Sequence, residues 1–233
     1  PCAIKRKDLK RILAGCVKKS KFNNSYVEMI QTRGMSPTFD RDPRKSKPRF
    51  LAFAIPFGWI LDPKKFDVGI DLAISKIKRI SPESVDPRVK NYHWGDFTQG
   101  IFEAKDKNYE TVILLDYDGN VTEGPGFNVF AVKDKVLITP DRGVLAGVSR
   151  KTVLEMAEHL GINTSVRSLS VEELLEADEV FLSSSGGGVI PIIRVNETIF
   201  GNGASGPISV QLNETYWAWT TLEKYRDPID YEP

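Results

Sequence analysis

Cysteine and histidine are scarce in this sequence, whose 233 residues include only two of each. Cys2 and Cys16 are too few for a disulfide framework, and neither belongs to a Cys-x-x-Cys pair. Structural zinc sites usually take four cysteine or histidine ligands, so we expect no metal site. Free cysteines are typical of a reducing compartment, which favours a cytoplasmic location.

The sequence also lacks a long apolar run and a strong excess of charge. No run is long enough to cross a bilayer, and residues 1–13 are too basic for a signal peptide. The net charge of +1 gives no general attraction to nucleic acid or an anionic membrane, so we expect neither as a partner. Without a signal peptide, five Asn-x-Ser/Thr triplets are expected to stay unglycosylated. They begin at Asn23, Asn120, Asn163, Asn196 and Asn213.

The composition is that of a globular protein with a real core. Hydrophobic residues make up 41% and charged residues 27% of a chain long enough for one large domain or two small ones. The stretch "PFGWILDP" is bracketed by prolines, which favours a domain boundary there. We therefore predict a small α/β domain at 1–56, a linker at 57–63 and a larger domain at 64–233.

Hydrophobic periodicity predicts helices and strands in mixed order, and hence an α/β fold. Residues 8–20 have helical spacing, with Asp8 as a candidate N-cap. Residues 25–34 alternate like a strand, and the basic, proline-containing segment 35–49 is expected to be a mobile loop. The further expected elements are a doubly buried strand at 50–57, a strand at 69–79, a helix at 95–108, strands joined by turns at 111–140, a helix at 149–161 with Ser149 as N-cap, a helix at 170–178 with Ser170 as N-cap, and a strand at 179–192 that enters a glycine-rich loop.

Lys90 is the first candidate for chemistry, because it lies next to the aromatic stretch "NYHW". The simpler interpretation is a solvated surface cation. A lysine that loses hydration among Tyr92 and Trp94 would instead present a neutral, nucleophilic amine. Such an amine forms a Schiff base with a carbonyl cofactor.

Glu123 is the second candidate, because it interrupts the apolar stretch "VTEGPGFNVF". An edge carboxylate in a turn is the simpler alternative. The functional interpretation is a carboxylate that pairs with a ring nitrogen and keeps a pyridine protonated. Gly124 and Gly126 would then let the backbone approach a flat ring.

Two segments have the composition of phosphate-binding turns. Val148 and Ser149 stand at a predicted helix start, where backbone N–H groups and the helix dipole favour an anion. The run "SSSGGG", 183–188, offers hydroxyls and free N–H groups, although it lacks the P-loop pattern. A plain N-cap and a flexible connector are the alternatives.

An amine, a carboxylate and two phosphate-binding turns are what pyridoxal 5′-phosphate requires. The segments "VKNYHWGD", "VTEGPGFNVF", "TPDRGVLAGVSRKTV" and "EVFLSSSGGGVIPI" follow one another over most of residues 86–191. In content and order they resemble the class IV, branched-chain-type aminotransferases. That family has fold type IV, the D-amino-acid aminotransferase-like fold, with a small α/β domain and a larger α/β pseudo-barrel domain. Within it, "SYVEMIQTRG" and "DPRVKNYHWGDFTQGIFEA" look most like fungal (R)-selective amine transaminases.

The resemblance implies a role for each matching residue. Lys90 would be the Schiff-base lysine and proton carrier, and Glu123 would pair with the pyridine nitrogen. The remaining implied roles are phosphate binding by Val148, Ser149 and Ser185, packing against the ring by Leu145, and lining of the substrate pocket by Tyr26, Glu28 and Trp94.

The implied reaction is a ping-pong transfer of an amino group from a primary amine, in the (R) series, to a keto acid such as pyruvate. Branched-chain enzymes tend to have an arginine at the position of Glu28, so the glutamate favours a donor without an α-carboxylate. Arg41 or Arg44, on the loop, would bind the carboxylate of the acceptor. A branched-chain or D-amino-acid aminotransferase, and an aminodeoxychorismate-lyase-like enzyme, stay open as alternatives.

The resemblance also bears on assembly and on the start of the chain. Family members are homodimers with the site near the subunit interface, so we expect at least a dimer. The family's first domain normally begins earlier, with strands and an arginine that binds the cofactor phosphate. We therefore expect an N-terminally truncated chain with unpaired sheet edges. A protein that binds the cofactor without turnover is a further alternative.

Overall fold

The structure is a computed structural model that describes residues 4–66 and 69–231, and these residues form two compact units. Each unit has its own set of elements and is described by itself. The smaller unit runs to Gly58 and takes in the segment from Arg226 onward, and the larger unit runs from Trp59 to Tyr225.

Polar contacts join the C-terminal segment to the smaller unit. Lys10 Nζ lies 2.9 Å from Oδ1 of Asp227, and the Tyr231 hydroxyl donates to the Phe22 carbonyl at 3.0 Å. The predicted large domain, by contrast, included this segment. The boundary between the units falls within the predicted linker 57–63.

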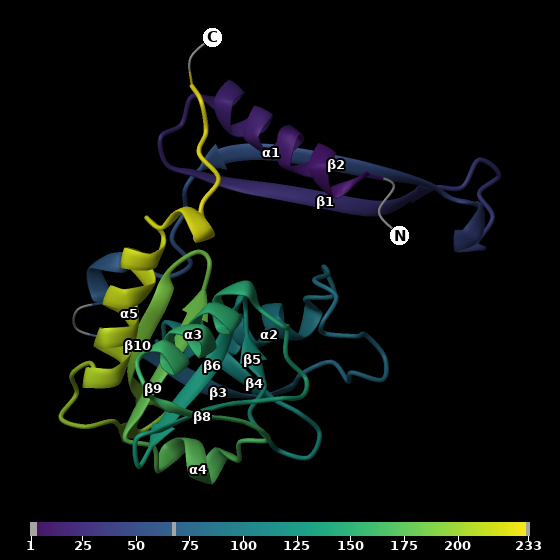
Figure 1. Ribbon diagram of the computed structural model, residues 1–233. Helices are drawn as coiled ribbons and strands as arrows, with labels where there is room; N and C mark the ends of the chain where they lie inside the picture. Colours follow the sequence, from purple (N-terminus) through teal and green to yellow (C-terminus); the bar gives the residue numbers. More distant parts are fainter. Residues whose placement is uncertain (1–3, 67–68, 232–233) are drawn as a thin grey trace. The chain divides into compact units, whose positions relative to one another are not determined.

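The smaller unit is a two-stranded antiparallel sheet with one helix along it (Figure 1). Its elements are α1 (Arg6–Ser20), β1 (Ser25–Met35), the 3-10 helix η1 (Pro43–Lys45) and β2 (Lys47–Pro56). The expected helix and strands are thus confirmed. The predicted N-cap is wrong, because Lys5 is the N-cap and Asp8 lies inside the first turn. There the Asp8 carboxylate interacts favourably with the positive end of the helix dipole. The second strand was expected to be buried on both faces, but Leu51, Phe53 and Ile55 are exposed on one side.

The larger unit is built on one mixed sheet of order β4-β3-β10-β9-β6-β7-β8, with β11 paired to β10 and β5 paired to β6 (Figure 1). Its strands are β3 (Ile70–Lys78), β4 (Thr111–Leu115), β5 (Glu123–Gly124), β6 (Phe127–Lys133), β7 (Val136–Thr139), β8 (Asn163–Val166), β9 (Glu179–Ser184), β10 (Gly188–Val195) and β11 (Thr198–Ile199). Its helices are η2 (Pro63–Lys65), α2 (Gly95–Asp106), α3 (Val148–His159), α4 (Val171–Leu175), α5 (Pro207–Trp219) and η3 (Glu223–Tyr225).

The central strands of this sheet are buried on both faces. Phe130 of β6 pairs with Phe181 of β9, and their rings stack 4.9 Å apart beneath α3 and α5. The alternate residues Val129 and Leu182 belong to a second core cluster, which includes Leu174 of α4. Burial of both faces explains why β6, β9 and β10 read as continuous apolar runs. These layers confirm the predicted α/β class.

One local prediction for this unit needs correction. Ser149 is not an N-cap: α3 begins at Val148, because the Gly147 carbonyl already accepts the first helical hydrogen bond, from Lys151 N–H, at 3.0 Å. The glycine-rich run forms the tight turn of an antiparallel hairpin in which Gly188 pairs with Ser184, which disfavours the alternative of a flexible connector. Helix α5 was not predicted. Within the described residues, no helix is long and apolar enough to cross a membrane, and no cluster of candidate metal ligands occurs.

Glu103 of α2 provides a test of how this helix is held on the sheet. Its carboxylate accepts hydrogen bonds from Ser75 Oγ at 2.7 Å, Lys76 N–H at 2.9 Å and Lys107 Nζ at 2.8 Å. Burial opposes ionisation, but these donors outweigh it and lower the pKa of Glu103 to about 2. The contribution of Glu103 to stability is therefore complete above the ordinary pKa of 4.5 and is lost as pH falls toward 2.

We predict that Glu103→Gln lowers the free energy of unfolding at pH 7 by about 1–2 kcal/mol, and that the difference shrinks below pH ~4.5. Urea unfolding of both proteins between pH 7 and pH 3 measures it. Glu158→Gln, at an exposed position of α3, is the matched control and should change stability little at any pH. A Glu103→Gln deficit that stays constant with pH would contradict the ionised role.

Candidate active site

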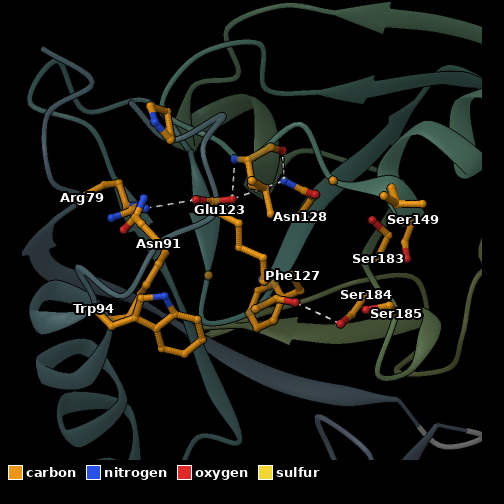
Figure 2. A pocket seen from close by; sticks show the side chains of 18 residues that line it. Arg79, Asn91, Trp94, Glu123, Phe127, Asn128, Ser149, Ser183, Ser184 and Ser185 are labelled. Atoms are coloured by element: carbon orange, nitrogen blue, oxygen red, sulfur yellow. Dashed lines mark hydrogen bonds and ion pairs between the residues drawn. The ribbon is translucent and has the colours of Figure 1, made fainter. Parts of the chain in front are cut away.

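A pocket of about 180 Å³ lies in the larger unit, and segments far apart in the sequence line it. They are the loop before α2, the β5–β6 turn, the residues that lead into α3, and the β9–β10 hairpin (Figure 2). Six of the residues predicted to bind the cofactor or carry catalysis line this one pocket: Lys90, Glu123, Leu145, Val148, Ser149 and Ser185.

Glu123 is a buried carboxylate at the side of this pocket (Figure 2). Its Oε2 accepts a hydrogen bond from Leu145 N–H at 2.8 Å, and its Oε1 lies 3.3 Å from Arg79 Nη2. Burial raises the pKa of the Glu123 carboxyl, while Leu145 N–H, Arg79 and Lys90 oppose that rise. Donors on several elements therefore hold the Glu123 carboxyl group in a fixed orientation.

Asn128 fixes the strand that follows Glu123 to the segment that leads into α3. Its Nδ2 donates to the Leu145 carbonyl at 3.0 Å and lies 3.4 Å from Glu123 Oε2. A side chain on Gly147 would come within 2.2 Å of Asn128 Oδ1, so this position requires glycine. Asn128 thus sets the distance between Glu123 and the start of α3.

Lys90 also lines the pocket, but its environment differs from the prediction. Lys90 is exposed, as are its aromatic neighbours Tyr92 and Trp94. Trp94 contacts Phe97 edge to face at 5.4 Å rather than covering the lysine. The expected loss of hydration is therefore wrong for the chain as it stands, because this loop lies at the pocket mouth. Lys90 is close enough to Glu123 to favour the ionised carboxylate.

The first turn of α3 faces the pocket with its N–H groups. The first four N–H groups of a helix have no partner within it, and the N-cap residue Gly147 supplies no side-chain acceptor. Ser149 is buried there, and its Oγ lies 3.2 Å from the Tyr216 hydroxyl of α5. The Val148 side chain is 82% exposed, so this residue contributes its backbone N–H group to the site rather than side-chain packing. This arrangement suits an anion.

The three serines of the β9–β10 hairpin have different surroundings (Figure 2). Ser184 Oγ donates to the Gly126 carbonyl at 2.9 Å and accepts from Gly186 N–H at 3.2 Å. Ser183 is 2% exposed, and its Oγ has no hydrogen-bond partner among the described residues. Ser185 is exposed at the pocket. A buried hydroxyl without a partner, at a pocket wall, fits a site that takes a polar ligand.

The predicted substrate-pocket residues divide between the units. Trp94 lines the pocket of the larger unit. Tyr26 and Glu28 lie on the same face of β1 in the smaller unit, where burial and the Glu28 charge raise the pKa of Tyr26. Their role in substrate binding stays a prediction. Of the two loop arginines, Arg44 is engaged with Asp42 through a bidentate ion pair, with Nη2 and Oδ2 2.7 Å apart.

These surroundings fit pyridoxal phosphate. The pocket offers a lysine amine, a buried carboxyl group for the ring nitrogen, helix N–H groups with the Ser185 hydroxyl for the phosphate, and the unpartnered Ser183 hydroxyl. Three further residues at the site were missed by sequence reasoning: Arg79, Asn128 and Tyr216. Asn128 lies within a quoted motif. Arg79 and Tyr216 become neighbours of the site only through tertiary packing.

Comparison with known proteins gives a consistent result. The family model "Amino-transferase class IV" matches residues 1–195. The branched-chain-amino-acid aminotransferase of Salmonella typhimurium is 29% identical over 224 residues, which cover 92% of this chain and 72% of that protein. The crystal structure of the Escherichia coli branched-chain aminotransferase superposes with a TM-score of 0.92 at 26% identity, over 99% of this chain and 78% of that one. The structure of the Thermobaculum terrenum branched-chain aminotransferase in its pyridoxal-phosphate form superposes with a TM-score of 0.85 at 25% identity. The superposition covers 97% of this chain and 75% of that one.

The fold and the pocket define a pyridoxal-phosphate enzyme of fold type IV, in which the larger unit carries a curled, half-barrel sheet. The chain belongs to the class IV aminotransferase family. It is an aminotransferase of the EC 2.6.1 type, its cofactor is pyridoxal 5′-phosphate, and its substrates are small-molecule amino and keto acids.

We predict opposite roles for two adjacent serines. Ser184→Ala removes two hydrogen bonds and should lower the free energy of unfolding of the cofactor-free protein by about 1–3 kcal/mol. Ser183→Ala removes a hydroxyl without a partner and should leave that stability unchanged or raised. Urea unfolding measures both. Equal losses in the two variants would show that Ser183 has a structural partner.

Proposed function

We propose that this chain transfers an amino group from a primary amine without an α-carboxylate, in the (R) series, to a keto acid such as pyruvate by ping-pong kinetics. One observation carries the transaminase part of the proposal: Lys90, Glu123 and the start of α3 meet at one pocket although they lie on separate segments. When bound, pyridoxal phosphate supplies a carbonyl that condenses with amines and a ring that accepts electrons.

The residues of the pocket divide the work of the reaction. Lys90 Nζ would hold the cofactor between turnovers and would move a proton to and from the donor carbon. Glu123 would accept a hydrogen bond from the ring nitrogen and favour its protonated form. The N–H groups of Val148 and Ser149, with the Ser185 hydroxyl, would hold the phosphate. Leu145 would pack against the ring.

The donor preference rests on Glu28. A carboxylate on that face of β1 repels a donor that carries its own carboxylate and accepts an amine that lacks one. For the acceptor carboxylate we favour Arg41 over Arg44, because Arg44 is already paired with Asp42. The homodimer and the cytoplasmic location also stay predictions.

A second candidate is transamination of branched-chain amino acids. It is favoured by the relatives named above, which are branched-chain aminotransferases. In that case Glu28 would lie outside the donor site, and a different cationic group would bind the donor carboxylate. The two candidates share the pocket chemistry and differ only in the donor.

We predict that Lys90 is the lysine that bonds to the cofactor. Borohydride reduction of the cofactor-loaded protein, followed by digestion and mass spectrometry, should find the cofactor on the peptide that contains Lys90. Lys90→Arg, which keeps the charge but loses the nucleophile, should retain weak binding and lose the visible absorbance band and turnover. Lys76→Ala, at an exposed position of β3, is the control and should behave as the unaltered protein. Modification of another lysine would refute the assignment.

We predict that Glu28→Arg moves donor preference toward amino acids. Rates with (R)-1-phenylethylamine, (S)-1-phenylethylamine, L-leucine and D-alanine, each with pyruvate, should favour the (R)-amine in the unaltered chain. In Glu28→Arg the ratio of kcat/KM for L-leucine to that for the amine should rise roughly tenfold, about 1.4 kcal/mol. A strong preference for L-leucine in the unaltered chain, unchanged in the variant, would establish the branched-chain candidate instead.

A further inference from the structure

Arg79 lines the pocket next to Glu123, and the proposed reaction gives it no step of its own. It directly follows β3, and its backbone N–H donates to the Leu115 carbonyl at 2.8 Å, which fixes it to the edge strand β4. Its side chain is 5% exposed. A guanidinium buried this deeply needs hydrogen-bond and ion-pair partners that compensate for its loss of hydration.

The guanidinium of Arg79 bridges two carboxylates (Figure 2 shows the contact with Glu123). Nη1 donates to Asp96 Oδ2 at 2.6 Å, and Nη2 lies 3.3 Å from Glu123 Oε1. The group also lies over the Phe97 ring, with Cζ 4.1 Å from its centroid, and its Nε has no hydrogen-bond partner among the described residues. The contact with Asp96 is the shorter of the two, so the guanidinium is bound more closely to Asp96 than to Glu123.

Asp96 belongs to the first turn of α2, the helix that follows the Lys90 loop. Its Oδ2 also accepts from Ile80 N–H at 2.8 Å, next to Arg79 in the chain. The Ile80 N–H therefore helps to hold the Asp96 carboxylate in place independently of Arg79. Asp96 and Glu123 therefore compete for the same guanidinium: a closer contact of Arg79 with one carboxylate weakens its attraction to the other.

We propose that Arg79 is a positioning residue that orients Glu123 and, by dividing its charge between Asp96 and Glu123, sets the pH range over which Glu123 stays ionised. The inference rests on the role proposed for Glu123 at the ring nitrogen. If Glu123 became neutral, it would no longer favour a protonated ring, so this buried arginine would adjust the electron-accepting power of the cofactor without touching it.

Other charges face Glu123 from the elements around it, and they do not replace Arg79. Lys90 favours its ionised form from the pocket mouth, where water screens it. Arg150 of α3 also senses the Glu123 charge, but its Nη2 donates to the Pro140 carbonyl at 2.8 Å and its charge is shared with Asp141. Among the described residues, Arg79 is the cation with a direct ion pair to Glu123.

Two substitutions should move the titration of Glu123 in opposite directions. Arg79→Gln removes the nearest positive charge and should raise the pH midpoint of Glu123 by about one unit or more. Asp96→Asn keeps an acceptor for Ile80 N–H but removes the competing charge, so it should lower the midpoint. A purely structural ion pair predicts lower stability in both variants and no opposed shifts.

Carbon-13 NMR of the full chain, labelled at the glutamate carboxyl carbons, measures the midpoint directly. The Glu123 resonance is assigned by its loss in Glu123→Gln. Opposed shifts in Arg79→Gln and Asp96→Asn support the proposal. If Arg79→Gln does not fold, Arg79→Lys, which keeps the charge but not the two-pronged donor, should give a smaller rise in the midpoint, and Asp96→Asn still tests the sign. Unchanged midpoints in folded variants overturn it.

A parallel measurement separates this inference from the proposed function. In the cofactor-loaded protein, the pH profile of kcat should shift with the same sign as the NMR midpoint. If the chain bound no pyridoxal phosphate, the proposed function would fail, while the NMR titration would still decide whether Arg79 controls Glu123. If the cofactor binds and the NMR midpoints shift but the kcat profile stays fixed, Glu123 does not act at the ring nitrogen and the inference fails with it.

Discussion

The larger unit encloses the acidic side chain of Glu123, and several of its elements supply the partners of that group. Transfer of a carboxylate from water to a protein interior costs several kcal/mol unless close partners compensate it. For Glu123 the partners come from three directions: Arg79 after β3, Leu145 N–H before α3, and Asn128 on β6. Two of these partners are fixed in turn, Arg79 by Asp96 and Asn128 by the Leu145 carbonyl. The end of β3, the start of α2 and the approach to α3 are thus linked through Glu123.

The sheet gives these partners a rigid support. Strands β6, β9 and β10 pack apolar side chains on both faces, so the residues at their ends have little freedom. The β5–β6 turn, the β9–β10 hairpin and the start of α3 then meet at one pocket. Loops that carry chemistry commonly rely on such a scaffold. The lysine loop is the exception, since Lys90 and its aromatic neighbours are exposed. The exposed part of the site therefore lies at Lys90 and the buried part at Glu123.

Much of this arrangement could be predicted from the sequence, and the rest depends on tertiary contacts. Apolar runs predicted β3, β6 and β9, and four motifs in order predicted the family and the pocket residues Glu123 and Ser149. Periodicity did not predict α5, whose apolar residues lie on no clear stripe, or the start of α3 at Val148. Local aromatic composition suggested a buried Lys90, but neighbours in sequence do not report solvent access. Arg79 is the last residue of the strand predicted at 69–79, and from the sequence alone it looks like an ordinary surface arginine. Only the tertiary structure brings Asp96 and Glu123 next to it. The exposed face of β2 was missed because an apolar run shows only that a strand can be buried.

The central claim is that Glu123 keeps the cofactor's ring nitrogen protonated. Nitrogen-15 NMR of the full chain loaded with pyridoxal phosphate labelled at the ring nitrogen tests it most directly. The account predicts the chemical shift of a protonated pyridine in the unaltered protein near neutral pH, and the shift of an unprotonated ring in Glu123→Gln. An unprotonated ring in the unaltered protein, or the same shift in both proteins, would contradict the account.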